Sequence, residues 1–355
     1  MNKQHEQLSI CENFEEAAKS ILNHSFAILR TDNVTKEALE KSWIASRNFL
    51  SHVQNNTIAV KNNSQKGSSS CTDSKKARVN KEQYLSKYRI VRGHLLGLNF
   101  PSEAKVLYRA FYDRGVEYVD ENVETQEQQL QPWPNDFDGG ELMCCSNDLS
   151  AKLHNTLISC LQNILLEVKK IHGKTITSRE TTAASYSNKR KLEYYVDCDE
   201  HQYNKQKQNV ASQSQRCGNF DNNEKTMMCP LDYFLYHNLD HNAINCSAHI
   251  DRGVLICISL TNVQGLEILS NESNEWVCPE DLSVLEGFHS EIEAGCSDLL
   301  CILSGDQLLK IVKKEVDPKD LVLEDDCPGL VACIHRVRQR LKRARLSISY
   351  ELRLP

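Results

Sequence analysis

The last third of the sequence is a series of short apolar runs separated by turns. The runs are rich in Val, Ile, Leu and Tyr, and Gly, Asn, Asp or Pro residues stand between them. Strands of this length, broken by such turns, are typical of a β-sandwich or β-barrel. We therefore predict an all-β back half from the runs DYFLYHN, GVLICISLTN, GLEIL, LLCILSGDQLLKIV, LVACIHRV and RLSISYELRL.

The front half carries helical patterns instead. Residues 10–53 read as helix, strand and helix, with Thr35 opening the second helix. A further helix is expected around residues 101–119. The clearest helix covers residues 149–171, where apolar residues recur at i, i+3, i+4 and i+7. The expected fold class is mixed α+β, with an N-terminal helical portion packed on a β core.

Two polar stretches suggest how the chain is divided. Residues 54–80 are rich in Ser, Asn and Lys, which predicts a disordered linker inside an otherwise mostly helical region, 10–172. Residues 173–228 have a similar composition and are predicted to be a mobile insertion. The β core then covers residues 229–355.

Composition excludes several function classes. The net charge is −6, which argues against a nucleic-acid binder, and the N-terminus lacks the apolar segment of a signal peptide. No apolar run approaches the ~20 residues that a membrane span needs. The fifteen cysteines contain no CxxC pair, so they indicate a reducing compartment and disfavour structural zinc. We expect a cytoplasmic or nuclear location and no obligate protein partner.

A histidine and an aspartate stand out at one of the apolar runs. His249 and Asp251 are two residues apart, so in an extended strand both side chains project from the same face. His335 lies in a second apolar run 84 residues after Asp251. Two imidazoles and one carboxylate on neighbouring strands would form the facial triad of non-haem Fe(II) oxygenases, which leaves coordination positions open.

The last run carries a cation on its polar face. Arg345 and Ser347 alternate with Leu346 and Ile348, so the arginine and the serine share one face of the strand. A buried guanidinium must be paired, and its planar fork matches a carboxylate. These two side chains could therefore hold the far carboxylate of a 2-oxo acid that chelates the iron.

Taken together, these motifs resemble the 2-oxoglutarate/Fe(II)-dependent dioxygenases of the isopenicillin N synthase-like group. HID at 249–251 is similar to the family's His-x-Asp motif, and HRV at 335–337 to its distal histidine motif. RLS at 345–347 matches its Arg-x-Ser motif, ten residues after that histidine. Two further segments look like the family's hairpin and its Gly-Asp segment before an apolar strand, namely GLEILSNESNEWV and AGCSDLLCILSGDQLLKI.

The resemblance implies a double-stranded β-helix, or jelly roll, with an iron site and a cosubstrate site. It implies His249, Asp251 and His335 as Fe(II) ligands. It implies Arg345 and Ser347 as ligands of 2-oxoglutarate, with Tyr236 as a further cosubstrate contact and ascorbate as a candidate reductant. The other expected partners are O₂ and a small organic substrate, which the enzyme most simply hydroxylates.

The sequence departs from the family pattern in several places. Arg252 stands between Asp251 and Gly253, the stretch between Asp251 and His335 is long, and residues 173–228 precede the core strands. The chain also ends directly after the strand that carries Arg345, where the family often has a further helix.

Two other functions remain open from the sequence. One is an Fe(II) oxidase that does not use 2-oxoglutarate, and the other is an inactive jelly-roll binding or scaffold protein. The segment RVRQRLKRAR, 336–345, contains six basic residues and could be a nucleic-acid patch or nuclear signal, but a solvated hairpin is favoured.

Overall fold

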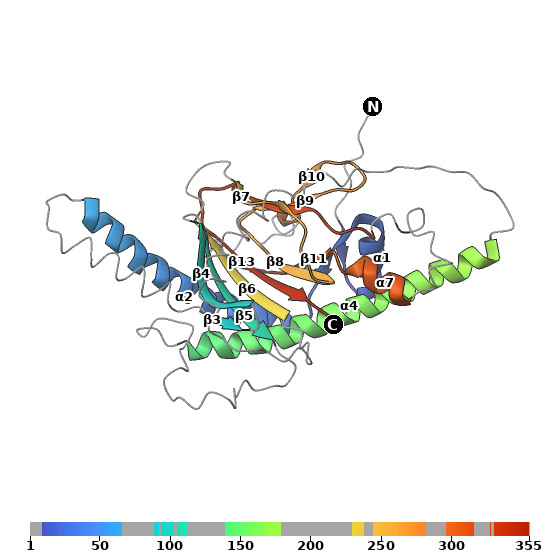
Figure 1. The fold of residues 1–355 in the computed structure, drawn as a ribbon, viewed down its shortest axis with the longest axis horizontal. Coiled ribbons are helices and arrows are strands. Elements are labelled where there is room, and N and C mark those ends of the chain that lie inside the picture. Colours follow the sequence, from blue (N-terminus) through green and yellow to red (C-terminus); the bar gives the residue numbers. More distant parts are fainter. Residues whose placement is uncertain are drawn as a thin grey trace, which may run out of the picture.

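The chain folds into two β-sheets covered by helices. The computed structural model describes residues 9–65, 89–91, 94–102, 105–112, 139–178, 229–237, 244–281, 296–315, 327 and 330–354. Within these residues a large sheet lies between the long helices and a smaller sheet (Figure 1). The expectation of a mixed helix-and-sheet protein is thereby confirmed.

The large sheet has nine strands from both halves of the chain, and β1 and β2 pair in parallel whereas its other strand pairs are antiparallel. In spatial order the strands are β1 (Ile10–Cys11), β2 (Phe26–Arg30), β11 (Cys296–Ser304), β8 (Leu255–Thr261), β13 (Arg345–Leu352), β6 (Cys229–Tyr236), β5 (Lys105–Tyr112), β4 (His94–Ser102) and β3 (Arg89–Val91).

The small sheet has four antiparallel strands and lies over the other face of the large sheet (Figure 1). Its spatial order is β10 (Trp276–Val277), β9 (Leu266–Leu269), β12 (His335–Arg338) and β7 (Ile244–His249). β7 is an edge strand of this sheet.

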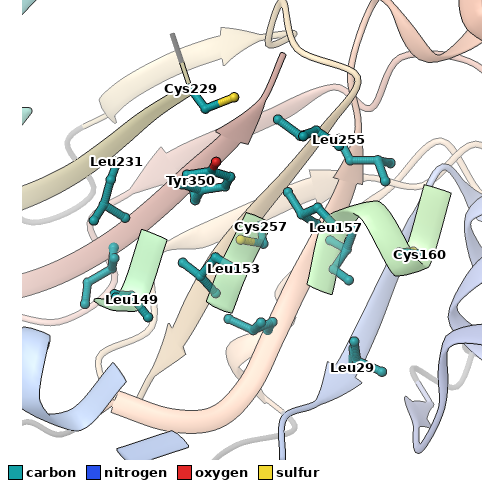
Figure 2. Packing of buried hydrophobic residues seen from close by; sticks show 14 of the residues in the cluster. Leu29, Leu149, Leu153, Leu157, Cys160, Cys229, Leu231, Leu255, Cys257 and Tyr350 are labelled. Atoms are coloured by element: carbon teal, nitrogen blue, oxygen red, sulfur yellow. The ribbon is translucent and has the colours of Figure 1, made fainter. Parts of the chain in front are cut away.

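Four helices complete the described fold: α1 (Phe14–His24), α2 (Asn33–Gln65), α4 (Gly140–Ser178) and α7 (Leu308–Glu315). The apolar stripe of α4 lies across the outer face of the large sheet, as predicted for residues 149–171. Figure 2 shows Leu149, Leu153 and Leu157 of this helix packed among strand residues such as Leu231 and Tyr350. All five side chains are buried, so this contact contributes strongly to the fold.

Strand alternation produces two separate apolar cores. On β11, Leu300 and Ile302 belong to the core beneath the helices, whereas Leu299, Cys301 and Leu303 belong to the core between the sheets. Successive strand residues point to opposite faces, so a strand covered on both faces must be apolar throughout. This explains why the last third of the sequence contains continuous apolar runs.

The structure corrects the helix predicted around residues 101–119. Residues 105–112 form β5, which pairs with β6, and residues 94–102 form β4. The predicted helical front region therefore also supplies strands to the large sheet. Hydrogen bonding to β6 decides the conformation, because aromatic and β-branched residues favour a strand where a partner is available.

Three further boundaries differ from expectation. Asp32 rather than Thr35 caps α2, since its carboxylate accepts a hydrogen bond from the Thr35 N–H at 2.7 Å. α2 continues to Gln65, into the predicted 54–80 linker, because no Gly or Pro interrupts it before Gly67; the rest of that linker is outside the described residues. The segment after Gly305-Asp306, expected to be a strand, is helix α7.

The predicted insertion at 173–228 is described only at its start, where residues 173–178 belong to α4. Its remaining residues lie outside the described part of the chain. Among the helices that the structure describes, none combines the length and apolar character of a membrane-spanning segment.

Candidate metal centre

The pairing of β7 with β12 brings two predicted site residues together. His249 at the end of β7 is the direct cross-strand partner of His335 at the start of β12. Their imidazole rings have centroids 4.3 Å apart and are tilted by 51°. The two histidines are 86 positions apart in the chain, so only this antiparallel register makes them neighbours.

Asp251 lies two residues after the end of β7 and completes the group. Its carboxylate lies between the two imidazoles, with Oδ1 3.7 Å from His249 Nε2 and Oδ2 3.4 Å from His335 Nε2. One donor atom from each of these three residues lies within 4.8 Å of the others, so they could hold a metal ion. The structure thus brings together all three side chains that the sequence analysis chose as ligands.

Backbone carbonyls orient both imidazoles. His249 Nδ1 lies 2.7 Å from the Ser247 carbonyl oxygen, and His335 Nδ1 lies 3.4 Å from the Cys333 carbonyl oxygen. An Nδ1–H that donates to a carbonyl leaves the Nε2 lone pair free, and Nε2 faces Asp251 in both residues. Metal-binding histidines are commonly fixed in this way.

The two imidazoles differ in their electrostatic surroundings. Burial opposes charge on His249, but the Cys246 thiol, the Asp251 carboxylate and the Ser247 carbonyl outweigh it and raise the pKa of His249 to about 9. Burial lowers the pKa of His335 to about 4, opposed by Asp251 and reinforced by His249. The His335 side chain is 4% exposed, whereas those of His249 and Asp251 are 26% and 29% exposed, so the group opens on the side of His249 and Asp251.

Two glycines allow the backbone to close around Asp251. The loop after β11 donates hydrogen bonds to this turn, including Asp306 N–H to the Asp251 carbonyl at 3.0 Å. A Cβ on Gly305 would collide with the Gly253 carbonyl, and a Cβ on Gly253 would lie 2.5 Å from Glu351 Cγ. Because neither glycine has a Cβ, the two backbone segments can approach closely enough to form the hydrogen bonds that fix the backbone of Asp251.

Arg345 lies where the alternation on β13 predicted, facing the space between the sheets, but it has a partner that the sequence did not reveal. Its Nε and Nη2 donate to Glu280 Oε1 at 3.1 and 2.8 Å. Arg345 is 1% exposed and the Glu280 side chain 0%. The buried guanidinium is therefore neutralised by a carboxylate of the same chain.

Glu280 is held by backbone donors as well. Its Oε2 accepts hydrogen bonds from the N–H groups of Gly265 and Leu266, at 2.5 and 3.0 Å. Thr261 Oγ1 donates to Oε1 at 3.3 Å. By contrast, Nη1 of Arg345 is buried and has no hydrogen-bond partner in the described structure. The Nε and Nη2 atoms of the guanidinium therefore bind Glu280, and Nη1 is available to a ligand.

The other two predicted cosubstrate residues lie beside Arg345. Ser347 is buried on the same face of β13, two residues further along the strand. Tyr236 is the cross-strand partner of Arg345, and the Arg345 Cζ lies 5.7 Å from the centre of its ring. Burial raises the pKa of Tyr236 far above its ordinary value, so its hydroxyl stays protonated at neutral pH.

Lys105, a second cation near Arg345 and the candidate metal centre, was not identified from the sequence. The Lys105 ammonium on β5 lies 4.0 Å from Cys246 Sγ, and that sulfur lies 3.8 Å from His249 Nδ1. The alternation of Lys105 with Val106 and Tyr108, both buried, would have shown that the lysine lies on the other face of a strand. The helical prediction for this segment hid that signal. Glu280 had no comparable signal, because a single carboxylate after a hairpin has no diagnostic pattern.

The basic segment 336–345 is used in internal ion pairs. Arg336 Nε and Arg340 Nη2 donate to the carboxylate of Glu267 at 2.6 and 2.8 Å, and Glu267 is buried. The Arg336 guanidinium also lies 3.9 Å from the centre of the Trp276 ring. Arg336 and Arg340 thus pair within the fold, whereas residues 341–344 are exposed, as the favoured prediction of a solvated hairpin expects.

Comparison with known proteins gives structural likeness only. No protein-family model matches the chain, and no curated protein matches its sequence. Similar solved structures include a full-length protein of Neurospora crassa in complex with alpha-KG, at 14% identity and a TM-score of 0.48, covering 96% of this chain and 78% of that one.

Two further similar structures come from a dioxygenase and from a protein in complex with 2OG and Fe. The dioxygenase for auxin oxidation in rice has 10% identity and a TM-score of 0.46, covering 96% of this chain and 78% of that one. JOX2 in complex with 2OG, Fe and JA has 11% identity and a TM-score of 0.47, covering 98% and 75%. At these values the function has to follow from the residues of the site.

Proposed function

We propose that this chain is a non-haem Fe(II) dioxygenase that uses 2-oxoglutarate, and that its two facing sheets form a double-stranded β-helix. The observation that carries the proposal is the convergence of His249, Asp251 and His335. Two neutral imidazole nitrogens and one carboxylate are the donor set of the facial-triad iron enzymes. In this proposal residues 229–355 form the catalytic core, and the strands before residue 112 extend its large sheet.

The donor set fits Fe(II). His249 and His335 would each bind through Nε2, which the backbone contacts at Nδ1 leave free. Asp251 would bind through one carboxylate oxygen, and its exposed side leaves room for further ligands. Bound Fe(II) with 2-oxoglutarate and O₂ supplies the oxidising power for C–H hydroxylation, with release of succinate and CO₂.

The protein would orient the cosubstrate with groups below the metal site. Arg345 Nη1, which has no partner in the described structure, can donate to the far carboxylate, and Ser347 lies on the same face of β13. Tyr236, whose hydroxyl keeps its proton, lies between β5 and β13 and lines the same space. The substrate in this proposal is a small organic molecule that approaches from the open side of Asp251.

One observation favours a second candidate, an Fe(II) oxidase that does not use 2-oxoglutarate. Glu280 already occupies Nε and Nη2 of Arg345, the two nitrogens that are otherwise well placed for a bidentate grip on a ligand. In this second candidate the arginine would be structural, and O₂ would be reduced at the iron site by electrons from the substrate or another reductant.

Formation of succinate separates the two candidates. Purified protein is incubated with Fe(II), 2-oxoglutarate, ascorbate and O₂, without and with candidate substrates, and succinate is quantified. The dioxygenase proposal predicts succinate that requires Fe(II) and is absent from the Asp251→Ala variant. Consumption of O₂ without succinate formation would support the oxidase instead.

A further inference from the structure

We propose that Lys105 binds the far carboxylate of the 2-oxo acid, together with Nη1 of Arg345. This inference rests on the proposed function and adds a cosubstrate-binding residue from outside the core strands. The reason is electrostatic: Glu280 cancels the charge of Arg345, so a dicarboxylate needs a second cation.

The large sheet places Lys105 and Arg345 on either side of the same residue. Tyr236 on β6 is the direct cross-strand partner of Lys105 on β5 and of Arg345 on β13. Cross-strand partners project from the same face of a sheet. The two cations and the tyrosine therefore form one row that faces the small sheet.

Contacts with the small sheet show how far this row lies from the metal-binding histidines. Along β12, His335 is opposite His249, and Val337 is opposite Cys246 on one side and Leu266 on the other. Lys105 approaches Cys246, and Arg345 packs against Gly265, next to Leu266. Both cations thus lie about one step of strand alternation, roughly 7 Å, below the metal-binding histidines.

This depth suits a ligand that chelates the metal at one end. The 2-oxo acid group of 2-oxoglutarate would reach the metal, and its second carboxylate would extend into the space between the two sheets. At that level the carboxylate would lie above Tyr236, between the Lys105 ammonium and the Arg345 guanidinium. Charged donors on both sides would compensate for removing the anion from water.

The immediate surroundings of Lys105 leave its charge available. Its ammonium lies 4.6 Å from the centre of the Phe234 ring and 5.6 Å from that of Tyr236, as in cation–π contacts. It also lies 4.0 Å from the Cys246 sulfur. Within the described residues no carboxylate pairs with Lys105, whereas Arg109 on the same face is paired with Asp232.

A pair of ligands that differ in one carboxylate tests the inference without turnover. 2-Oxoglutarate and 2-oxopentanoate share the metal-chelating end, but 2-oxopentanoate lacks the far carboxylate. Both are titrated anaerobically into the Mn(II)-loaded protein by calorimetry, using wild type, Lys105→Met and Lys105→Arg. Lys41→Met removes a surface charge on α2 and serves as the matched control.

The expected result is selective. Lys105→Met should raise the Kd for 2-oxoglutarate at least about tenfold and change that for 2-oxopentanoate and Mn(II) less than about twofold. Lys105→Arg should keep most of the affinity, and Lys41→Met should behave as wild type. These variants therefore distinguish the loss of one charge contact with the ligand from a general loss of folded structure.

Two results would overturn the inference. One is a Lys105→Met variant that keeps the wild-type preference for 2-oxoglutarate over 2-oxopentanoate, which would leave Arg345 as the anchor and the proposed function intact. The other is a wild-type protein that binds both ligands equally well. Failure of the Mn(II)-loaded wild type to bind either 2-oxo acid would instead contradict the proposed function itself.

Discussion

His249 and His335 are direct cross-strand partners at adjoining ends of β7 and β12, with ring centroids 4.3 Å apart. The Nε2 atoms of both point toward the carboxylate of Asp251. Both Nε2 atoms and the carboxylate converge on one space, where a metal ion would be coordinated by two neutral imidazoles and one anion. The geometry of the strand ends therefore favours a metal between the three side chains.

Asp251→Ala should abolish 1:1 metal binding. The carboxylate is the one anionic donor of the group, and two imidazoles alone make a weak site for Fe(II) or Mn(II). Metal content after loading and desalting measures the effect. Asp306→Ala is the matched control, because this nearby aspartate contacts Asp251 only through its backbone N–H. Equal metal content in wild type and Asp251→Ala would contradict the ligand assignment.

Breaking the Glu280–Arg345 pair from one side should destabilise the fold more than removing both charges. Glu280→Leu leaves a guanidinium that is 1% exposed without a counter-charge, which costs about 3–5 kcal/mol of unfolding free energy. The double variant Glu280→Leu/Arg345→Met should recover a substantial part of this loss. Urea unfolding curves of wild type, Glu280→Leu, Arg345→Met and the double variant give the comparison, and additive losses of the two single variants would show that the two residues do not interact.

The contribution of Glu267 to stability should vanish at low pH. Burial tends to raise the pKa of Glu267, but hydrogen bonds from Arg340 and Arg336 outweigh it and lower the pKa in the folded protein. A lowered folded-state pKa stabilises the protein above the unfolded pKa, about 4.3, and this stabilisation disappears as the pH falls through the folded value.

Glu267→Gln measures that contribution. The variant should lose about 1–3 kcal/mol near neutral pH and differ little from wild type once the pH lies below the lowered folded-state pKa of Glu267. Unfolding free energies of both proteins are compared across this range. A difference that stays constant with pH would mean that the arginines do not stabilise the charged carboxylate.

Two glycine substitutions should affect different parts of the site. Gly305→Ala forces a Cβ against the Gly253 carbonyl and displaces the loop that binds the Asp251 backbone, so metal affinity should fall about 10–100-fold. Gly265→Ala places a Cβ 2.9 Å from Arg345 Cδ and should weaken 2-oxo acid binding while sparing the metal. Calorimetric titration of each variant distinguishes the two effects. Identical behaviour of both variants would contradict the division into a metal site and an anchor.

The three side chains of the candidate metal centre could be chosen from sequence because several motifs, each weak alone, occur in a consistent order along the chain. His249 and Asp251 are spaced for one face of a strand, and His335 lies on the buried face of β12, where buried and partly exposed positions alternate. The same alternation predicted the inward face of Arg345 and Ser347. The direction of these side chains follows from alternation within their own strands.

Lys105 and Glu280 could not be assigned in that way. Lys105 acquires its position only when β5 pairs with β6, and the pattern around residues 101–119 also fits a helix. Glu280 reaches Arg345 because the hairpin of β9 and β10 folds over β13, which is a tertiary contact with no sequence period. Both residues lie at the anchor, where the proposed chemistry depends on long-range contacts.

Anaerobic titration of the metal-free protein with Fe(II) and then with 2-oxoglutarate tests the central claim most directly. The account predicts one Fe(II) per chain, followed by a saturable visible charge-transfer band when 2-oxoglutarate is added, and loss of the band when O₂ is admitted. Fe(II) binding without such a band would contradict the role of 2-oxoglutarate, and absence of Fe(II) binding would contradict the metal site formed by His249, Asp251 and His335.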